Sequence, residues 1–258
     1  MTRPVGLQPA DLAEVMGRFG VAEQQVRRDH AISHILAALS SHQDEVVFFG
    51  GTALSRTHLR DERLSEDIDL VATHDRDKLA VALSNDISNA LARTHGRITW
   101  SPGWSRNSDI EPAVAITPDG LAVRIQLIRG THYEPWPTEI RKIEQRYRDA
   151  PAAVLRVPTL PAFAGWKTAA WMDRAAARDL YDLWALTKVD ALNADAAALF
   201  AQHGPTSHPP RSWMFNHAPT ATEWRSQLAG QTRLTVTAPE ALAAVRAAWA
   251  ATLDEQWA

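Results

Sequence analysis

The sequence predicts an α+β protein built from two domains. Up to about residue 155, short apolar runs typical of strands alternate with segments of helical periodicity, and beyond that point almost every segment has a helical pattern. The segment 149–161 between the two parts holds three prolines. We therefore expect N-terminal helices and a strand-containing domain over residues 1–155, and a helical domain over residues 156–258.

The strand-containing part can be assigned segment by segment. Apolar or alternating runs predict strands at 45–49, 66–72, 97–102, 113–117 and 122–128. Helical spacing of apolar residues predicts helices at 9–42, divided at Gly20, and at 76–95. The segment 50–60 starts as a glycine turn and continues as a helix.

The helical part is rich in alanine and tryptophan. Residues 159–189 are expected to be helical, 202–213 a loop, and 238–258 a final helix with Pro239 near its start. The chain has 258 residues, of which 45% are hydrophobic, so it can hold two modest domains with a real core.

Composition limits the classes of function. The net charge is −3, so any contact with nucleic acid has to come from a local basic patch. The chain has no cysteine, which excludes disulfides and thiolate metal sites. The N-terminus lacks the apolar core of a signal peptide and no apolar run is long enough to span a bilayer, so we expect a cytoplasmic protein.

Asp67 and Asp69 lie one residue apart inside an otherwise apolar segment. In a strand, residues i and i+2 project from the same face, so both carboxylates point the same way, with Ile68 and Leu70 packed behind them. Buried carboxylates need a cation, and such a pair can ligate Mg²⁺, which also takes phosphate oxygens. A solvated strand face or a cap is the alternative for this pair on its own.

Gly50, Gly51 and Thr52 stand at the junction between the preceding strand and a helix. Glycines there let backbone N–H groups approach phosphates, the start of the helix favours an anion, and the Thr52 hydroxyl can add a hydrogen bond. A glycine pair alone is usually a turn. In the order strand, Gly-Gly, helix, strand, the two motifs together favour a site for a metal-bound nucleotide.

A second polar cluster lies on the first helix of the helical part. If this helix is continuous, Lys167, Arg174, Arg178 and Asp182 fall near one face, and Asp179 lies further round. Taken alone, the pattern fits an amphipathic helix with a charged outer face, or an Asp179 that caps a new helix after the alanine triplet.

These motifs together carry a family resemblance. Gly-Gly-Thr-Ala-Leu at 50–54, Arg-Leu-Ser-Glu-Asp-Ile-Asp-Leu at 63–70, and Lys167 with Arg-Asp-Leu-Tyr-Asp-Leu at 178–183 resemble the AbiEii/AbiGii nucleotidyltransferase toxins. These are the toxin halves of type IV toxin–antitoxin systems and include the mycobacterial MenT toxins. The first segments are shared with the wider DNA polymerase β-like nucleotidyltransferase superfamily, and the last points to the toxin group.

The resemblance implies a mixed-sheet nucleotidyltransferase domain followed by a helical domain, with the active site between them. It implies Mg²⁺-dependent transfer of a nucleoside monophosphate from an NTP substrate to RNA. In the MenT branch the acceptor is the 3′ end of tRNA, and its modification blocks charging and translation. A cognate antitoxin protein is the expected partner.

The resemblance also assigns the site. Asp67 and Asp69 are expected as metal ligands and, together with Lys167 and Asp182, as catalytic residues. The expected nucleotide-binding residues are Gly50, Gly51, Thr52, Arg63, Ser65, Lys167 and Asp179. For Arg63, an equal alternative is pairing with an acid that braces its own loop.

Gln126 departs from the superfamily pattern. Many polymerase β-like enzymes place a third carboxylate on a later strand, here 122–128, where Gln126 occupies the inward position. Glutamine cannot replace an anionic ligand or a base. Proton removal then falls to water or to another acid, and a full two-metal site is in doubt.

RNA contact has a weaker signal. The segment 140–148 carries four basic residues against Glu144 alone, which could follow a phosphate backbone or could be a solvated helix face. The ten tryptophans are expected mostly in the core, and the ten histidines show no metal-ligand spacing, so no zinc site is expected.

The sequence therefore predicts a nucleotidyltransferase toxin that acts on RNA. Two alternatives stay open: transfer to a small molecule such as an aminoglycoside, and a non-catalytic nucleotide-binding regulator. A basic rim at the site favours tRNA, whereas an acidic pocket favours an aminoglycoside.

Overall fold

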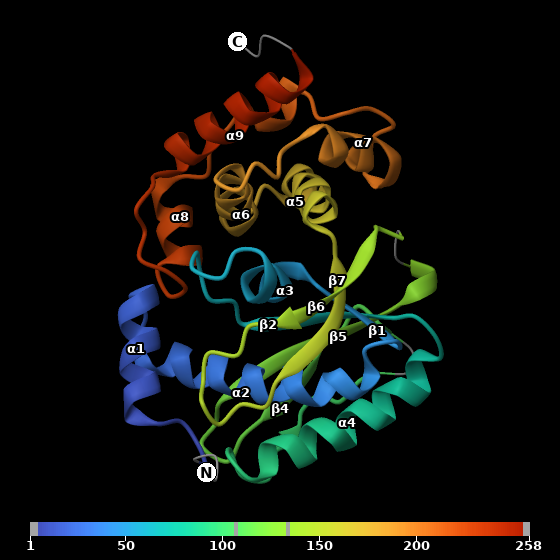
Figure 1. The fold of residues 1–258 in the computed structure, drawn as a ribbon, viewed down its shortest axis with the longest axis vertical. Helices are drawn as coiled ribbons and strands as arrows, with labels where there is room; N and C mark the ends of the chain where they lie inside the picture. Colours follow the sequence, from blue (N-terminus) through green and yellow to red (C-terminus); the bar gives the residue numbers. More distant parts are fainter. Residues whose placement is uncertain (1–4, 106–107, 133–134, 255–258) are drawn as a thin grey trace. The chain divides into compact units, whose positions relative to one another are not determined.

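The computed structural model describes residues 5–105, 108–132 and 135–254. The chain forms two compact units: unit 1 comprises residues 1–134 and 138–157, and unit 2 comprises residues 135–137 and 158–258 (Figure 1). Within the described residues, no helix combines the length and the apolar character that crossing a membrane requires.

Unit 1 is built on a mixed sheet, which has seven strands among the described residues, in the order β3-β4-β5-β2-β1-β7-β6. The strands are β1 (Val46–Phe49), β2 (Asp67–Ala72), β3 (Thr99–Trp100), β4 (Ala113–Ile116), β5 (Ala122–Arg129), β6 (Thr138–Ile143) and β7 (Ala153–Pro158). The strand β2 lies between β1, which is antiparallel to it, and β5, which is parallel. This central place buries Ile68 and Leu70 completely.

Four helices accompany the sheet within the described part of unit 1: α1 (Pro9–Phe19), α2 (Glu23–Leu39), α3 (Gly50–Thr57) and α4 (Arg76–Ala92). Gly20 ends α1 in the left-handed conformation, with a φ of 69°, and the Asp75 side chain caps α4. The helices α2 and α4 pack side by side and both contact β5 (Figure 1). The helix α3 follows β1 directly and packs on β2.

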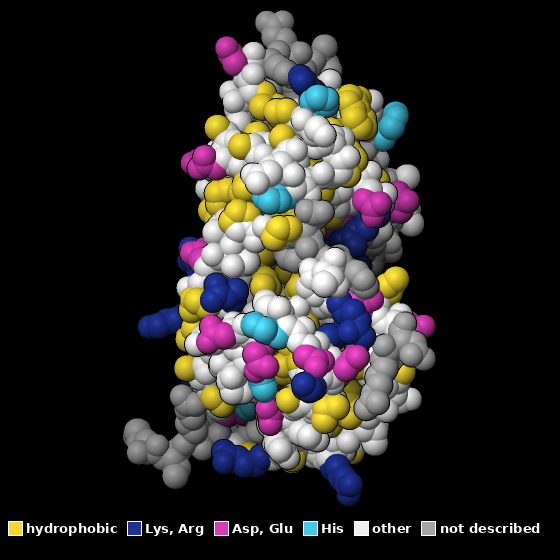
Figure 2. Space-filling view, turned by 90° about the vertical axis from the view of Figure 1, so that its right-hand side faces the viewer, with side chains coloured by type: hydrophobic (Ala, Val, Ile, Leu, Met, Phe, Trp, Pro, Cys, Tyr) yellow, Lys and Arg dark blue, Asp and Glu magenta, His cyan; other side chains and the backbone are white. Residues whose placement is uncertain are grey.

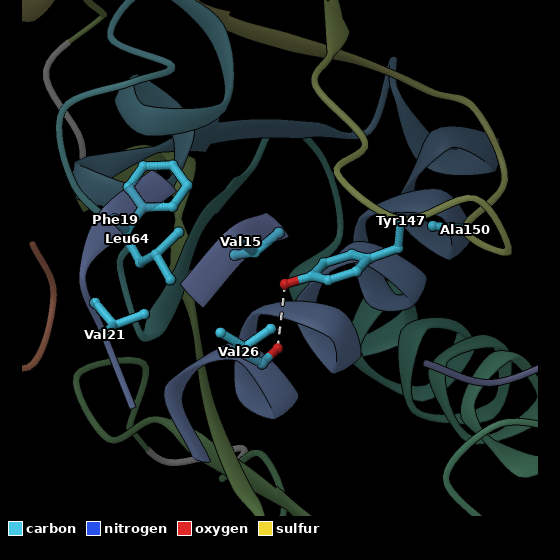
Figure 3. Packing of buried hydrophobic residues seen from close by; sticks show 7 residues of the cluster. All are labelled: Val15, Phe19, Val21, Val26, Leu64, Tyr147 and Ala150. Carbon is cyan, nitrogen blue, oxygen red and sulfur yellow. Dashed lines mark hydrogen bonds between the residues drawn. The ribbon is translucent and has the colours of Figure 1, made fainter. Parts of the chain in front are cut away.

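A hydrophobic cluster joins α1, α2 and two loops of unit 1 (Figure 3). Its buried members are Val15, Phe19, Val21, Val26, Leu64, Tyr147 and Ala150. Leu64 comes from the loop before β2, and the Tyr147 hydroxyl donates a hydrogen bond to the Val26 carbonyl at 3.1 Å. Leu64 buries its apolar side chain in this cluster, which stabilises its position. The packing of Leu64 therefore anchors the loop that also carries Arg63 and Ser65.

Every element of unit 2 that the structure describes after residue 158 is helical. The α-helices are α5 (Leu160–Arg174), α6 (Ala177–Thr187), α7 (Ala194–His203), α8 (Ala221–Leu228) and α9 (Ala238–Leu253). The helix α5 packs on α6 and α7, and α6 packs on α8 and α9. Capping boxes at Thr220 with Glu223 and at Thr237 with Glu240 start α8 and α9.

The predicted α+β class is confirmed, and each predicted strand segment contains a strand. The strands β6 and β7 were not predicted. The alternative of a solvated helix face at 140–148 is wrong, because the first residues of this segment belong to β6 and the rest is irregular. The sequence of β6, Thr-Glu-Ile-Arg-Lys-Ile, is polar because β6 is an edge strand of the sheet.

The helical segment predicted at 159–189 is confirmed, but it consists of two helices and not of one continuous helix. The helix α5 ends at Arg174, Ala175 adopts the left-handed conformation with a φ of 47°, and α6 begins at Ala177. The break falls within the alanine triplet 175–177, where a new helix was one of the alternatives, although alanine itself favours an unbroken helix. The final helix is observed over Ala238–Leu253, and the predicted residues 255–258 lie outside the described part.

Candidate active site

The two predicted motifs of unit 1 are in direct contact. Gly50 has a φ of 74°, and a Cβ on this residue would collide with the carboxylate oxygen Oδ2 of Asp69. In the sheet, Phe49 pairs with Asp69, which places the end of β1 beside the carboxylate. Glycine is therefore required at position 50 both by the backbone conformation and by the close approach of Asp69.

Gly51 is crowded by the other predicted site residues. A Cβ on Gly51 would lie 2.6 Å from Nη2 of Arg63 and 3.2 Å from Oγ of Ser65. Arg63 is only 3% exposed, and its Nη1 donates to the Leu64 carbonyl at 3.1 Å. Arg63 and Ser65 thus pack against the glycine turn, and the guanidinium is part of the support of this turn.

Thr52 and Asp67 connect α3 to the start of β2. The Thr52 hydroxyl donates a hydrogen bond to the backbone carbonyl of Asp67, and Thr52 is buried. In this structure the hydroxyl therefore positions β2 against α3. The Asp67 carboxylate is 41% exposed, and its Oδ1 lies 3.9 Å from Nε of Arg124, whose side chain is 64% exposed.

Gln126 lies next to Asp69 in the parallel register of β2 and β5. Its side-chain amide donates to the Ile110 carbonyl at 3.1 Å. The neighbouring residue of β5 on the same face is Arg124, which pairs with Asp67 in the register. The strand β5 thus places the amide of Gln126 and the guanidinium of Arg124 on the face of the sheet that carries the two carboxylates.

The donors of this site fit a hard divalent cation. Asp67 and Asp69 are half-buried on one face of β2, and the absence of a Cβ at Gly50 lets the Asp69 carboxylate lie against the glycine turn. Carboxylate oxygens are the ligands that Mg²⁺ prefers, and two of them leave coordination positions for water and phosphate oxygens. Asp67 and Asp69 are therefore the residues that would hold such an ion.

Unit 2 brings Lys167, Asp179 and Asp182 together. The ammonium group of Lys167 on α5 lies 3.0 Å from Oδ1 of Asp179 and 2.6 Å from Oδ2 of Asp182, both on α6. Arg174 adds contacts of 2.6 Å and 3.0 Å to Asp179. The helix break at Ala175 makes this possible, because it folds α6 back toward α5.

The expectation of a charged outer helix face is wrong for this cluster. Lys167 is 7% exposed and Asp179 is fully buried. Asp179 does not cap α6 either, because the N-cap residue is Ala176. Burial disfavours the charge of Asp179, but the ammonium of Lys167 and the guanidinium of Arg174 outweigh burial and hold the pKa of this carboxyl below its ordinary value of 3.8.

The basic segment 140–148 is largely committed to ion pairs. Arg146 is buried and contacts Asp29 at 3.0 Å, Arg148 contacts Asp11 at 2.7 Å, and Arg141 contacts Glu139 at 3.1 Å. On the face shown in Figure 2, the described Lys and Arg side chains stand among Asp and Glu side chains rather than in one continuous patch. Arg146 is therefore part of a buried network, whereas Arg141 and Arg148 form ion pairs that stay partly exposed.

Sequence reasoning missed a cluster of histidines in unit 1. His30 and His34, one helical turn apart on α2, both contact the carboxylate of Asp149, and His30 also contacts His95. Burial lowers the pKa of His30, His34 and His95, in the last case to about 4. The i,i+4 spacing was a usable signal, but Asp149 is too distant in the sequence to be paired with it by inspection.

Comparisons with known proteins show the family and the fold of this chain. Residues 34–256 match the family described as nucleotidyl transferase AbiEii toxin, type IV TA system. No curated protein matches the chain.

Among solved structures, a protein of H. pylori described as a nucleotidyltransferase is 17% identical, with a TM-score of 0.57 over 91% of this chain and 96% of that one. This likeness shows the fold. An antigenic nucleotidyltransferase-like protein from Paracoccidioides brasiliensis is 13% identical, with a TM-score of 0.40 over 67% of this chain and 87% of that one. On the family match, which spans most of the chain, the protein is an enzyme of nucleotidyl transfer and belongs to the AbiEii family of toxins.

Proposed function

We propose that this enzyme transfers a nucleoside monophosphate from an NTP to the 3′ end of tRNA, in a Mg²⁺-dependent reaction centred on Asp67 and Asp69. The observation that carries the proposal is the contact between the two motifs: Gly50 has to be glycine because Asp69 lies against it. The glycine turn can bind phosphates, and the two acids can hold a cation. Because they are in direct contact, they form a single site.

An RNA acceptor is supported by Arg124. Its guanidinium is largely exposed and lies beside Asp67 on the same face of the sheet. The positive charge of Arg124 attracts a polyanionic acceptor such as RNA and repels a polycationic aminoglycoside.

The reaction joins the 3′-hydroxyl oxygen of the acceptor to the α-phosphorus of the NTP and breaks the bond from the α-phosphorus to the bridging oxygen, so pyrophosphate leaves. A divalent ion supplies positive charge to the phosphate oxygens. Backbone N–H groups at Gly50 and Gly51 orient the phosphates, since the first N–H groups of α3 have no partner within the helix. The hydroxyl proton passes to water, because the amide of Gln126 cannot accept it.

Thr52, Arg63 and Ser65 act in this scheme as positioning residues. Thr52 holds the start of β2, and Arg63 and Ser65 pack on Gly51. The roles of Lys167, Asp179 and Asp182 in catalysis and nucleotide binding stay predictions from the family resemblance.

The experiment is nucleotide transfer by the purified protein. Total tRNA is incubated with each labelled NTP in turn, with Mg²⁺ or with EDTA, and with tRNA whose 3′ end has been oxidised by periodate. We expect Mg²⁺-dependent labelling of intact tRNA and none of oxidised tRNA. Labelling of an aminoglycoside but not of tRNA would move the proposal to the small-molecule alternative.

Substitution of the carboxylates tests the centre itself. Asp67→Asn and Asp69→Asn keep the size of the side chain but remove the charge, and we expect each to lower the rate by about 100-fold or more. Asp44→Asn in the same unit is the control, since its side chain is 78% exposed. Near wild-type rates in the Asp67 and Asp69 variants, with unchanged melting temperatures, would refute the assignment.

A further inference from the structure

A second donor set in unit 1 is independent of Asp67 and Asp69. Nε2 of His30 lies 3.0 Å and 3.1 Å from the two oxygens of Asp149, and Nε2 of His34 lies 3.2 Å from Oδ2. One ligand atom from each of these three residues can be chosen so that all lie within 4.8 Å of one another. The side chains of His30, His34 and Asp149 are 2%, 6% and 2% exposed.

The nitrogen–oxygen separations suit a single small metal ion, whereas the set as a whole extends to 4.8 Å and has to contract when it binds one. Zinc binds imidazole nitrogen at about 2.0–2.1 Å and carboxylate oxygen at about 2.0–2.2 Å in a tetrahedron, which puts neighbouring ligand atoms about 3.3 Å apart. The nitrogen–oxygen distances of 3.0 Å and 3.2 Å are within a few tenths of an ångström of that spacing. Two histidines at i and i+4 on one helix also form a known zinc-binding pair.

We propose that His30, His34 and Asp149 bind one Zn²⁺ ion, at a site distinct from the expected Mg²⁺ site. Two imidazoles and one carboxylate favour zinc over magnesium, which prefers oxygen ligands and keeps its water. Three protein ligands leave a fourth position for water.

The hydrogen bonds behind His30 suit a metal ligand. Nδ1 of His30 lies 3.0 Å from Nε2 of His95, and Nδ1 of His95 lies 2.8 Å from the Thr94 hydroxyl. With His30 bound to the ion through Nε2, its Nδ1–H donates to His95, and the Nδ1–H of His95 donates to Thr94. This chain fixes the tautomer and orientation of His30, as partners of metal-bound histidines commonly do.

The site borders a cavity on one side. This cavity of about 270 Å³ is lined by His30, His95 and Thr94 together with Arg27, Asp119 and apolar residues. His34 and Asp149 do not line it, so only His30 of the three proposed ligands lies at the cavity wall.

A zinc ion at this place would cross-link unit 1. It would join α2 to the segment between β6 and β7, which contains Asp149. Asp29, the residue before His30, contacts Arg56 on α3 at 2.8 Å and Arg146 at 3.0 Å. The proposed ion therefore supports the same helix pair that carries the glycine turn.

The test is zinc binding by the full chain after removal of metals with EDTA. Zn²⁺ is titrated in competition with a chromophoric chelator, and we expect one equivalent per chain that millimolar Mg²⁺ does not displace. Zn²⁺ at about 100 times its dissociation constant should raise the melting temperature by about 5 °C or more. Co²⁺ in place of zinc should give the visible absorption of a four-coordinate ion.

Variants of the proposed ligands test which side chains bind the ion. His34→Gln and Asp149→Asn should weaken zinc binding by about 100-fold or more, and His95→Gln by about 10–100-fold, as for partners of metal ligands. His74→Gln removes an exposed histidine of the same unit and should bind zinc like the wild type. Circular dichroism checks that each variant is folded.

Two results would overturn the proposal. One is no zinc uptake by the wild type above that of His34→Gln. The other is a full equivalent of zinc in folded His34→Gln and Asp149→Asn. Either result would make the histidine cluster a hydrogen-bond network alone.

Discussion

At the scale of single residues, the close approach of Asp69 decides what position 50 can be. Gly50→Ala adds a Cβ where the Asp69 carboxylate lies and also strains a backbone with a φ of 74°. We expect the variant to lose transfer activity, because the carboxylate has to move. The strain alone should lower the free energy of unfolding by about 1–2 kcal/mol.

Gly120→Ala separates the two effects. Gly120 has a φ of 84°, but a Cβ there meets no atom within 4 Å. It should therefore show the loss of stability without the loss of activity. Equal activity of both alanine variants would show that the contact between Gly50 and Asp69 does not matter for the reaction.

Residue-scale features differ in how far the sequence predicts them. The pairs Gly50-Gly51 and Asp67-x-Asp69 are close in sequence and have their own periodicity, so they can be read directly. The burial of Lys167 cannot be read from the sequence, because Lys167 pairs with Asp179 and Asp182 on the next helix, and these acids reach it only through the break between the two helices. The contact of His30 with Asp149 depends on residues 119 positions apart, which no local pattern reports.

At the scale of elements, α5 and α6 are joined by buried ion pairs that Lys167 forms with Asp179 and Asp182. Lys167→Met keeps the length of the side chain but leaves two buried carboxylates without this cation. Breaking a buried pair costs about 3–5 kcal/mol, so we expect a loss of that order in the free energy of unfolding, measured with urea.

Arg174→Gln is the matched control for that variant. Arg174 contacts the same Asp179, but its side chain is 60% exposed, so its loss should cost no more than about 1 kcal/mol. A double variant, Lys167→Met with Asp182→Asn, should recover part of the stability. Similar losses for Lys167→Met and Arg174→Gln would contradict the view that the buried cation joins the helices.

The same cluster predicts how stability depends on acid. The pKa of Asp179 is lower in the folded chain than its ordinary value of 3.8. Below about pH 4 the unfolded chain takes up a proton that the folded chain does not, so stability falls as the pH falls. Asp179→Asn removes this group, and the difference in unfolding free energy between wild type and variant should shrink from pH 6 to pH 2. A constant difference over this range would contradict the lowered pKa.

Elements were predicted well where their pattern is local and apolar. The strands β1, β2, β4 and β5 are apolar or alternating because they lie inside the sheet or one strand from its edge. The strand β6 was missed because an edge strand carries polar residues. The break between α5 and α6 stayed one of two alternatives, because alanine supports a helix on either side of it.

At the scale of the whole molecule, the α+β class follows from the change of pattern after Pro158, and the family follows from motifs in both halves of the chain. The acceptor does not follow from either. A basic run at 140–148 suggested a nucleic-acid surface, yet Arg146 is buried against Asp29, and the partly exposed Arg148 and Arg141 pair with Asp11 and Glu139. A basic run in the sequence does not tell which of its charges the fold buries and which it leaves at the surface.

The toxin role gives the last prediction, which concerns the complete protein in a cell. Expression of the wild type should slow the growth of a bacterial host, and Asp69→Asn expressed to the same level should not, because removal of one carboxylate stops transfer without unfolding the chain. The measurements are growth rate, protein level, and the 3′ ends of tRNA from the same cultures. Added nucleotides at those ends in the wild-type culture alone would tie slow growth to the chemistry at Asp67 and Asp69. Equal slowing by both proteins would place the toxicity outside this site.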